Sequence, residues 1–243
     1  MDSIAQRAMR NPLFSLVYEH FWRPTFTRLF SFGGHGTADF DRALSAYLSR
    51  PGERLMLDVA CGPGNYTRRI ADGLTGEGRC IGIDFSPSML ARAARTNSAS
   101  RASYIRADAH AIPFGDDTFD MVTCLAALYL IPDPLPVVDE LVRVTRPGGE
   151  IVVFTSVGSD LTALPGAREI AGASGFRIFD RHEIVERLRA AGSDHIEQTV
   201  SGLGQYVLAV KAGAVLPHET DSSAKDSDSA GTSRHGGAEQ PEQ

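Results

Sequence analysis

The sequence has few cysteines, and the three that it has form none of the patterns that make a disulfide framework or hold a zinc ion. Cys61, Cys80 and Cys124 include no CxxC pair, and no histidine stands near them at metal-ligand spacing. Disulfide-rich secreted domains and structural zinc sites depend on such patterns. We therefore expect a reduced, cytoplasmic protein that has no metal site.

Long apolar runs and an excess of basic residues are also missing. No stretch reaches the roughly 18 apolar residues of a membrane span, and Asn11-Pro12 and Glu19-His20 interrupt the N-terminal region before it resembles a signal peptide. The formal net charge is -6, and residues 218–243 hold six acids against two bases. About -2 therefore remains elsewhere, so we expect neither a nucleic-acid partner nor stable membrane insertion.

The length and composition of the chain fit one domain with a single hydrophobic core and extensions at both ends. A chain of 243 residues that is 42% hydrophobic and 22% charged can bury one substantial core. From about Pro217 onward the composition is polar and almost nothing is apolar, so ordering entropy cannot be offset there. We predict an N-terminal helical lid (1–50), a central domain (51–212) and a disordered acidic tail (213–243).

The central domain alternates short β-branched runs with helical stretches, which is typical of βαβ units around a mostly parallel sheet. Two further strands follow a helix at about 181–191 and lie four residues apart, so they should form a hairpin with one antiparallel strand. Gly-Pro turns, among them Arg146-Pro147-Gly148-Gly149, punctuate the connections. The predicted fold is a doubly wound seven-stranded α/β sheet whose strands are residues 54–60, 79–85, 103–108, 119–126, 150–157, 195–200 and 205–212.

The first strand runs into a glycine turn, LDVACGPG at residues 57–64. Gly62 and Gly64 allow close backbone approach to an adenosine-containing cofactor, but Thr67 stands where a dinucleotide fingerprint has its third glycine. A carboxylate from Asp58 at the mouth of the turn would repel a pyrophosphate and suit a cofactor that carries amines and a sulfonium. These features argue against a nicotinamide-dependent oxidoreductase without excluding it.

Two more acids end the next strands. Asp84 closes the second strand, where a carboxylate accepts hydrogen bonds from ribose hydroxyls, and Asp108-Ala109 closes the third, beside an expected adenine. With Asp58, these acids meet at the carboxyl edge of the sheet, where ligands bind in open α/β folds. Asp84 alone does not separate one adenosine cofactor from another.

Four blocks in order resemble the class I S-adenosylmethionine (SAM) dependent methyltransferases, in particular the group of ubiquinone and menaquinone C-methyltransferases. They are LDVACGPG, IGIDFSPSML, ADAHAIPFGDDTFDMV and ELVRVTRPGGEIVV, and the match runs from about Leu55 to Lys211. The resemblance implies a Rossmann-like fold with SAM as cofactor and a small-molecule methyl acceptor. It assigns to the cofactor site Asp58, Ala60, Gly62, Gly64, Asp84, Phe85, Met89, Asp108, Ala109 and Leu125.

The sequence departs from that family at two places. Ala60 stands where glycine is frequent, a change expected only to trim space beside the cofactor. The segment after the fourth strand reads Leu128-Tyr129-Leu130 where Leu-His-His is common. If a relative uses that histidine as a base or to anchor a water molecule, this protein cannot do so in the same way. Tyr129 and His110 are the candidate catalytic residues; a half-buried aromatic and a turn-capping histidine are the plainer interpretations.

The acceptor is the least constrained part of the prediction. Tyr18 and Trp22 belong to an aromatic N-terminal stretch that could line a pocket for a ring or lipid-like acceptor, or pack as an ordinary amphipathic helix. An aromatic, quinol, polyketide or lipid-like acceptor is favoured. A sugar or glycolipid O-methyltransferase and a catalytically inactive binding protein of the same fold remain alternatives, and a monomer or homodimer is expected.

Overall fold

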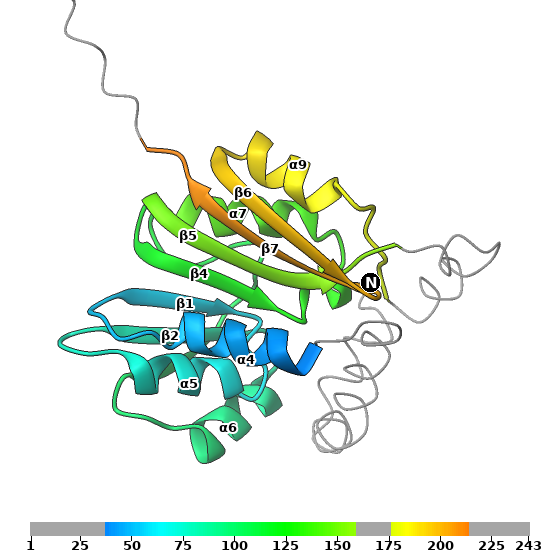
Figure 1. Ribbon diagram of the computed structural model, residues 1–243. Helices are drawn as coiled ribbons and strands as arrows, with labels where there is room; N and C mark the ends of the chain where they lie inside the picture. The colour runs from blue at the N-terminus through cyan, green and yellow to red at the C-terminus, as the bar shows by residue number, and fades with distance from the viewer. Residues whose placement is uncertain (1–36, 159–175, 214–243) are drawn as a thin grey trace, which may run out of the picture. The chain divides into compact units, whose positions relative to one another are not determined.

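The computed structural model describes residues 37–158 and 176–213 (Figure 1). Tyr18 and Trp22, most of the predicted lid and all but the first residue of the predicted tail lie outside the described residues. The elements in chain order are α4 (Thr37–Leu48), β1 (Leu55–Val59), α5 (Asn65–Gly73), β2 (Arg79–Asp84), α6 (Pro87–Thr96), β3 (Ala102–Arg106), β4 (Phe119–Leu125), the 3-10 helix η2 (Leu128–Leu130), α7 (Leu135–Val144), β5 (Thr145–Ser156), α9 (Glu183–Ala190), β6 (Ser193–Ser201) and β7 (Gly204–Lys211).

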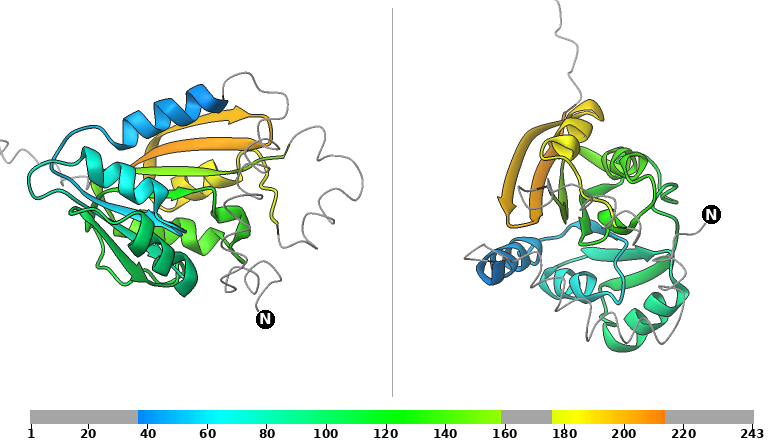
Figure 2. Two further views of the ribbon diagram at one scale, coloured as in Figure 1. Left: turned by 90° about the horizontal axis from the view of Figure 1, so that it is seen from below. Right: turned by 90° about the vertical axis from the view of Figure 1, so that its right-hand side faces the viewer.

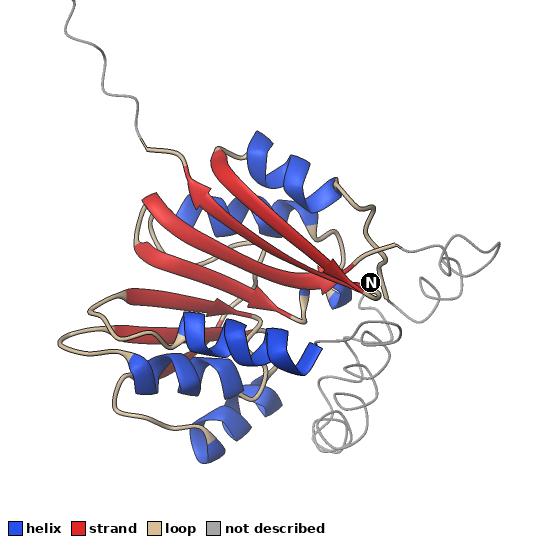
Figure 3. Cartoon of the chain, in the orientation of Figure 1, coloured by secondary structure: helices blue, strands red, loops and turns tan. Residues whose placement is uncertain are grey.

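The strands form one seven-stranded sheet in the order β3-β2-β1-β4-β5-β7-β6 (Figure 3). The first five pair in parallel, and β7 pairs antiparallel with both β5 and β6. The prediction of a doubly wound sheet with one antiparallel strand in a C-terminal hairpin is confirmed. The chain order reverses direction between β1 and β4, which is the point where such sheets bind ligands.

Helices cover both faces of this sheet (Figure 2). Alternate residues of β1 point to opposite faces, so Leu57 and Val59 join the core under α7 and α9, while Met56 joins the core under α4 and α5. Burial on both faces explains why the central strands read as continuous apolar runs rather than alternating ones. Leu48 of α4 lies in the second core, so the end of the predicted lid packs on the sheet.

The helices after β1 and β2 begin at the carboxyl edge of the sheet. Ser86 caps α6 by accepting a hydrogen bond from the N–H of Met89, and Pro87 occupies the first turn, where no N–H is needed. Gly64 precedes α5 in a left-handed conformation. Both helix starts therefore lie within a few residues of the predicted cofactor residues.

Among the predicted strand ends that differ from the structure, two move residues named above into another kind of segment. The Arg146-Pro147-Gly148-Gly149 stretch, predicted as a turn, lies within β5, because Thr145 already pairs with Phe119 directly after α7. The ladder then shifts register across this stretch before it resumes at Glu150. The second difference is at the end of β3, which is Arg106 rather than residue 108, so Asp108 lies in the following loop.

Within residues 37–158 and 176–213, no helix is both long enough and apolar enough to span a membrane.

Candidate functional site

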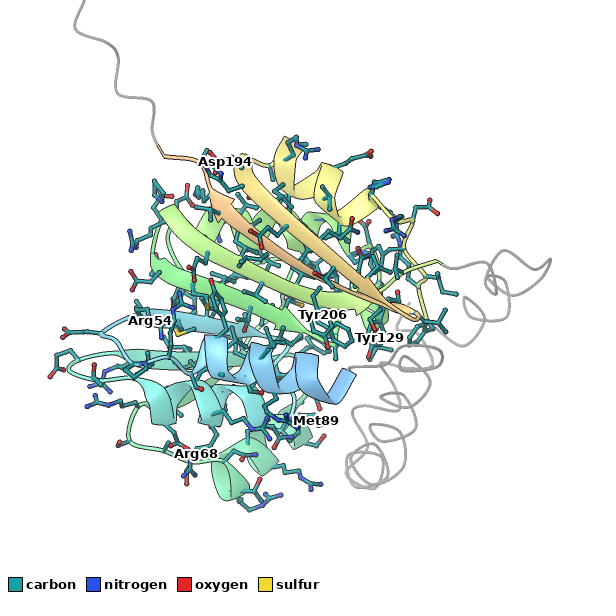
Figure 4. All side chains as sticks on the ribbon, in the orientation of Figure 1. Arg54, Arg68, Met89, Tyr129, Asp194 and Tyr206 are labelled. Carbon is teal, nitrogen blue, oxygen red and sulfur yellow. The ribbon has the colours of Figure 1, made fainter. Side chains whose placement is uncertain are left out.

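The predicted site residues gather at the carboxyl edge of the parallel strands. Figure 4 shows Tyr129 and Met89 at this end of the sheet, and Arg54 at the opposite end. The edge is made by the segments that follow β1, β2, β3 and β4. The fold thus brings the four sequence blocks together, as their order along the chain predicts.

Positions 62 and 64 of the turn are glycine for different structural reasons. Gly62 has a φ of +55°, and a Cβ there would meet no atom of residues 37–158 or 176–213 within 4 Å outside its own chain neighbours, so within this part of the chain the space in front of it is open. Gly64 has a φ of +80°, and a Cβ would come within 2.5 Å of the Tyr104 hydroxyl. Position 64 therefore excludes other residues by conformation and by contact. Position 62 leaves room for a ligand against the backbone.

Asp84 holds the turn from the end of β2. Its Oδ2 accepts a 2.8 Å hydrogen bond from the N–H of Gly62, and its Oδ1 accepts one of 2.8 Å from the N–H of Ser86. Burial raises the pKa of Asp84, and the two backbone N–H groups act in the opposite direction. A carboxylate offers about four acceptor positions, so Asp84 can hold the backbone and still accept bonds from ligand hydroxyls.

Asp58 lies deeper than the sequence suggests. Its side chain does not open at the mouth of the turn, because the residue is only 2% exposed. The hydroxyl of Thr67 donates to its Oδ2 over 2.6 Å, and that of Thr123 donates to its Oδ1 over 3.1 Å. Burial raises its pKa to about 6, against the opposing effect of these hydroxyls. Asp58 thus joins β1, α5 and β4 beneath the turn, rather than standing at the mouth of the turn as predicted.

Ala60 differs from glycine in more than the space it occupies. Its φ of +55° lies in the left-handed region, where a Cβ crowds the following carbonyl and costs about 1–2 kcal/mol. The expectation that this alanine only trims space was incomplete, since its backbone is also strained. Ala126, at the end of the neighbouring strand β4, has a φ of +57°. Strained residues of this kind cluster at functional sites.

His110 joins two loops at the adenine end of the predicted site. Its N–H and its Nδ1 lie 3.0 and 2.8 Å from Oδ1 of Asp108, and its Nε2 lies 2.9 Å from the carbonyl of Pro132 and 3.1 Å from that of Asp133. Both ring nitrogens face acceptors, and only a protonated imidazole donates from both. Burial alone lowers the pKa of His110, but these hydrogen bonds raise it overall. This geometry fits the interpretation of His110 as a turn-capping histidine, which here also connects a second loop.

The hydrogen bonds from His110 also act on Asp108. They lower the pKa of this carboxylate, the backbone N–H having the largest effect. Asp108 is exposed on the loop after β3, so it stays ionised and accessible. That placement suits the predicted contact with an adenine amino group.

Tyr129 is at the predicted edge but is buried. It is 4% exposed, its ring lies 4.4 Å from that of Phe176, and its carbonyl accepts a hydrogen bond from the N–H of Arg177. A second aromatic pair, Phe154 and Tyr206, is stacked at 4.3 Å on the other face of the sheet. Figure 4 shows Tyr129 and Tyr206 at the same end of the sheet.

The remaining predicted cofactor residues differ in exposure. Met89 and Leu125 are buried, Ala109 is half-buried, and Phe85 is 38% exposed with the Arg106 guanidinium 5.7 Å from its ring centre. Phe85 is therefore the apolar side chain most available to a ligand beside Asp84. The role of each residue toward a cofactor stays a prediction.

Four residues of the site escaped the sequence analysis: Thr67, Asn97, Tyr104 and Thr123. Thr67 stood out only as a missing glycine, and the others carry no motif. Their roles depend on side-chain hydrogen bonds to residues between 7 and 65 positions away. Only the three-dimensional fold brings these partners together.

Within the described residues, the cysteines do not form a reactive or metal-binding site. Cys61, Cys80 and Cys124 are free thiols, and burial raises the pKa of each, which makes them poor nucleophiles at neutral pH. No group of three or more His, Cys, Asp or Glu side chains in the described ranges is arranged to hold a metal ion.

Comparison with known proteins finds a family model that matches the central part of the chain. Residues 57–153 match a family model described as "Methyltransferase domain". A demethylmenaquinone methyltransferase of Bacillus licheniformis is 43% identical over 97 residues, which cover 40% of this chain and 42% of that protein. The matches to the first curated relatives thus cover between about two fifths and one half of those proteins.

Solved structures extend the likeness of the fold. Phosphoethanolamine N-methyltransferase 2 of Haemonchus contortus, solved with phosphomonomethylethanolamine and S-adenosylhomocysteine, has a TM-score of 0.67 at 18% identity, covering 85% of this chain and 59% of that one. The cyclase SpnF has a TM-score of 0.62 at 21% identity, covering 87% and 97%. At these identities the comparison concerns the fold alone.

Proposed function

We propose that the chain transfers a methyl group from SAM to a small-molecule acceptor, and the match of residues 57–153 to a methyltransferase domain model supports this proposal. A bound SAM supplies an electrophilic methyl group on a sulfonium, already activated for in-line displacement. The protein's part is then to bind, orient and exclude water from the reacting atoms.

The observation that carries this proposal is the arrangement around Gly62. Among the described residues, none fills the space in front of Gly62, while the N–H of Gly62 is fixed to Asp84, whose carboxylate has further acceptor positions. That combination fits a ribose whose hydroxyls bond to Asp84 while the rest of the cofactor passes over the glycine turn. Charge-assisted bonds of this kind contribute about 1.5–3 kcal/mol each.

The other predicted residues complete a cofactor path along the edge. Asp108 and Ala109 would receive the adenine, with Phe85 and Met89 on its apolar side. Gly64 and Ala60 shape the backbone where the methionine part would lie. Asp58 supports this turn from below through Thr67, rather than by facing the ligand directly.

For the acceptor we propose a planar aromatic or quinol-like molecule. The aromatic pairs Tyr129–Phe176 and Phe154–Tyr206 flank the ends of β4 and β5, and aromatic side chains favour flat ring ligands. The curated relative from Bacillus licheniformis is named for demethylmenaquinone, a quinone. An acidic phenol or quinol also needs little help in deprotonation, which fits an edge where Tyr129 replaces a histidine.

The proposal is tested by transfer of radiolabel from methyl-labelled SAM to a panel of quinol, polyketide, lipid, sugar and glycolipid acceptors. We expect labelled product with a quinol or other aromatic acceptor, and none with the Asp84→Ala variant. Labelling of the sugars alone would replace the proposed acceptor with a hydroxyl of that class. Binding of SAM without transfer to any acceptor would favour a binding protein of the same fold, a real alternative because SpnF shares the fold and is named a cyclase.

A further inference from the structure

We infer that Tyr104 and Asn97 are positioning residues for the methyl donor, because together they brace the outer half of the glycine turn. This inference rests on the proposed function. Neither residue belongs to a sequence block that marks the site, and neither would touch the reacting atoms. They act through the carbonyl groups of Pro63 and Gly64.

Asn97 holds the turn from the end of α6. As the C-terminal cap of that helix it projects its side chain back toward the glycine turn. Its Nδ2 donates hydrogen bonds of 2.7 Å to the carbonyl of Pro63 and 3.0 Å to Oδ1 of Asn65. One amide group thus ties the middle of the turn to the first residue of α5.

Tyr104 of β3 contacts both Asn97 and the glycine turn through its hydroxyl. Its hydroxyl donates a 2.7 Å hydrogen bond to the carbonyl of Asn97 and lies 3.4 Å from the carbonyl of Gly64. A hydroxyl has a single proton, so the shorter bond is the main one and the contact with Gly64 is weaker. Burial raises the pKa of Tyr104, so the hydroxyl stays a neutral donor throughout the neutral range.

Two glycines make room for this tyrosine. Tyr104 pairs with Gly82 in the β2–β3 ladder, and a Cβ on Gly82 would come within 3.0 Å of its ring. A Cβ on Gly64 would come within 2.5 Å of its hydroxyl. The ring therefore crosses Gly82 and reaches the underside of the turn. Glycine at position 64 is therefore required both by the left-handed backbone and by the close approach of the Tyr104 hydroxyl.

The turn is thus fixed at three consecutive residues from three elements. Asp84 at the end of β2 binds the N–H of Gly62, Asn97 at the end of α6 binds the carbonyl of Pro63, and Tyr104 in β3 approaches that of Gly64. These contacts set the peptide planes before a ligand arrives. Preorganisation of this kind raises affinity because less ordering is required on binding.

The test compares Tyr104→Phe with Tyr47→Phe in the full-length protein. Tyr47 is a matched control, since it is also partly buried and its hydroxyl bonds to Glu150 at the opposite end of the sheet. Calorimetric titration with S-adenosylhomocysteine should show binding roughly 2- to 10-fold weaker in Tyr104→Phe, the equivalent of one lost hydrogen bond. Tyr47→Phe should bind as the unaltered protein does.

Kinetics and stability separate positioning from a general structural role. With Tyr104→Phe, KM for SAM should rise while kcat at saturation stays the same, as expected when ground-state and transition-state binding fall together. The melting temperature of the free protein should fall no further than with Tyr47→Phe. A shared loss of stability with unchanged affinity would overturn the inference.

Hydrogen exchange gives a readout that does not depend on SAM. The amides of Gly62 and Gly64 donate to Asp84 and to the carbonyl of Cys61, so they should exchange several-fold faster in Tyr104→Phe if the brace holds the turn. Asn97→Asp, which replaces the donor with a carboxylate facing two acceptors, should increase exchange further. Unchanged exchange in both variants would overturn the inference even if SAM proved not to be the cofactor.

Discussion

The hydroxyl of Thr67 donates a 2.6 Å hydrogen bond to the carboxylate of Asp58, and both residues are buried. The residue that stands in place of a third glycine therefore has a positive role, which is to join the first turn of α5 to β1. Burial of a carboxylate nevertheless costs stability. Such a cost at the cofactor edge is typical of functional sites.

The first prediction concerns the pH dependence of stability. The folded-state pKa of Asp58 is about 6, above its unfolded value, so the folded protein binds this proton more tightly than the unfolded chain does. Stability from this group is therefore greatest below about pH 4 and decreases as pH rises toward 6, by roughly 3 kcal/mol in total. Asp58→Asn should lack this decrease, which urea unfolding of both proteins between pH 4 and 7 would measure.

Thr123→Val provides the companion experiment. Its hydroxyl bonds to Asp58 and favours the ionised form, so its removal should move the midpoint of the pH-dependent difference upward. If the stability difference between the unaltered protein and Asp58→Asn does not vary with pH, the buried carboxylate is not the source of the cost.

The second prediction concerns the strained backbone at Ala60. Its left-handed conformation costs about 1–2 kcal/mol in an alanine, while glycine loses about 0.5–1 kcal/mol more conformational entropy on folding. Ala60→Gly should therefore leave the free energy of unfolding unchanged or raise it by up to about 1 kcal/mol. Ala94→Gly, at an exposed position inside α6, should lower it by about 1 kcal/mol. An equal decrease in the free energy of unfolding in the two variants would contradict the proposed backbone strain at Ala60.

The third prediction concerns His110. Because its folded-state pKa is raised, its contribution to stability is fully present below the unfolded value near 6.5 and is lost as pH rises through the folded value. His110→Gln should therefore cost more at pH 6 than at pH 9, by no more than about 1 kcal/mol for a partly exposed pair. Thermal unfolding at the two pH values measures this difference.

The partner of His110 supplies the control. Asp108→Asn removes the carboxylate that bonds to Nδ1 and to the backbone N–H. In that background the His110→Gln substitution should have a smaller pH dependence. If the dependence is the same with and without Asp108, the contact between the two side chains does not set it.

Much of the fold could be predicted from the sequence because the signals are local. Buried strands read as apolar runs, and their alternation with helices predicted a mostly parallel sheet. The start of β5 was missed because Pro147-Gly148-Gly149 has the composition of a turn, whereas Thr145 already pairs with Phe119 before the register shifts. Composition cannot distinguish a turn from an irregularity within a strand.

The candidate site was predictable where a residue follows a strand end, as Asp84 does. It was not predictable where a side chain acts across the fold. Tyr104 reaches the glycine turn only because β3 pairs with β2 at Gly82. Asp58 lies near the end of β1 as predicted, but it is buried beneath the turn, where it accepts hydrogen bonds from Thr67 and Thr123 of two other elements.

The central claim is that the carboxyl edge binds SAM through Asp84, and calorimetric titration with SAM and S-adenosylhomocysteine tests it most directly. Asp120→Ala is the matched control, because Asp120 also accepts a backbone N–H, that of Leu55, but at the opposite edge of the sheet. We predict binding by the unaltered protein and by Asp120→Ala, and its loss in Asp84→Ala. No binding by the unaltered protein, or a titration with NAD(P)H in its place, would contradict the account.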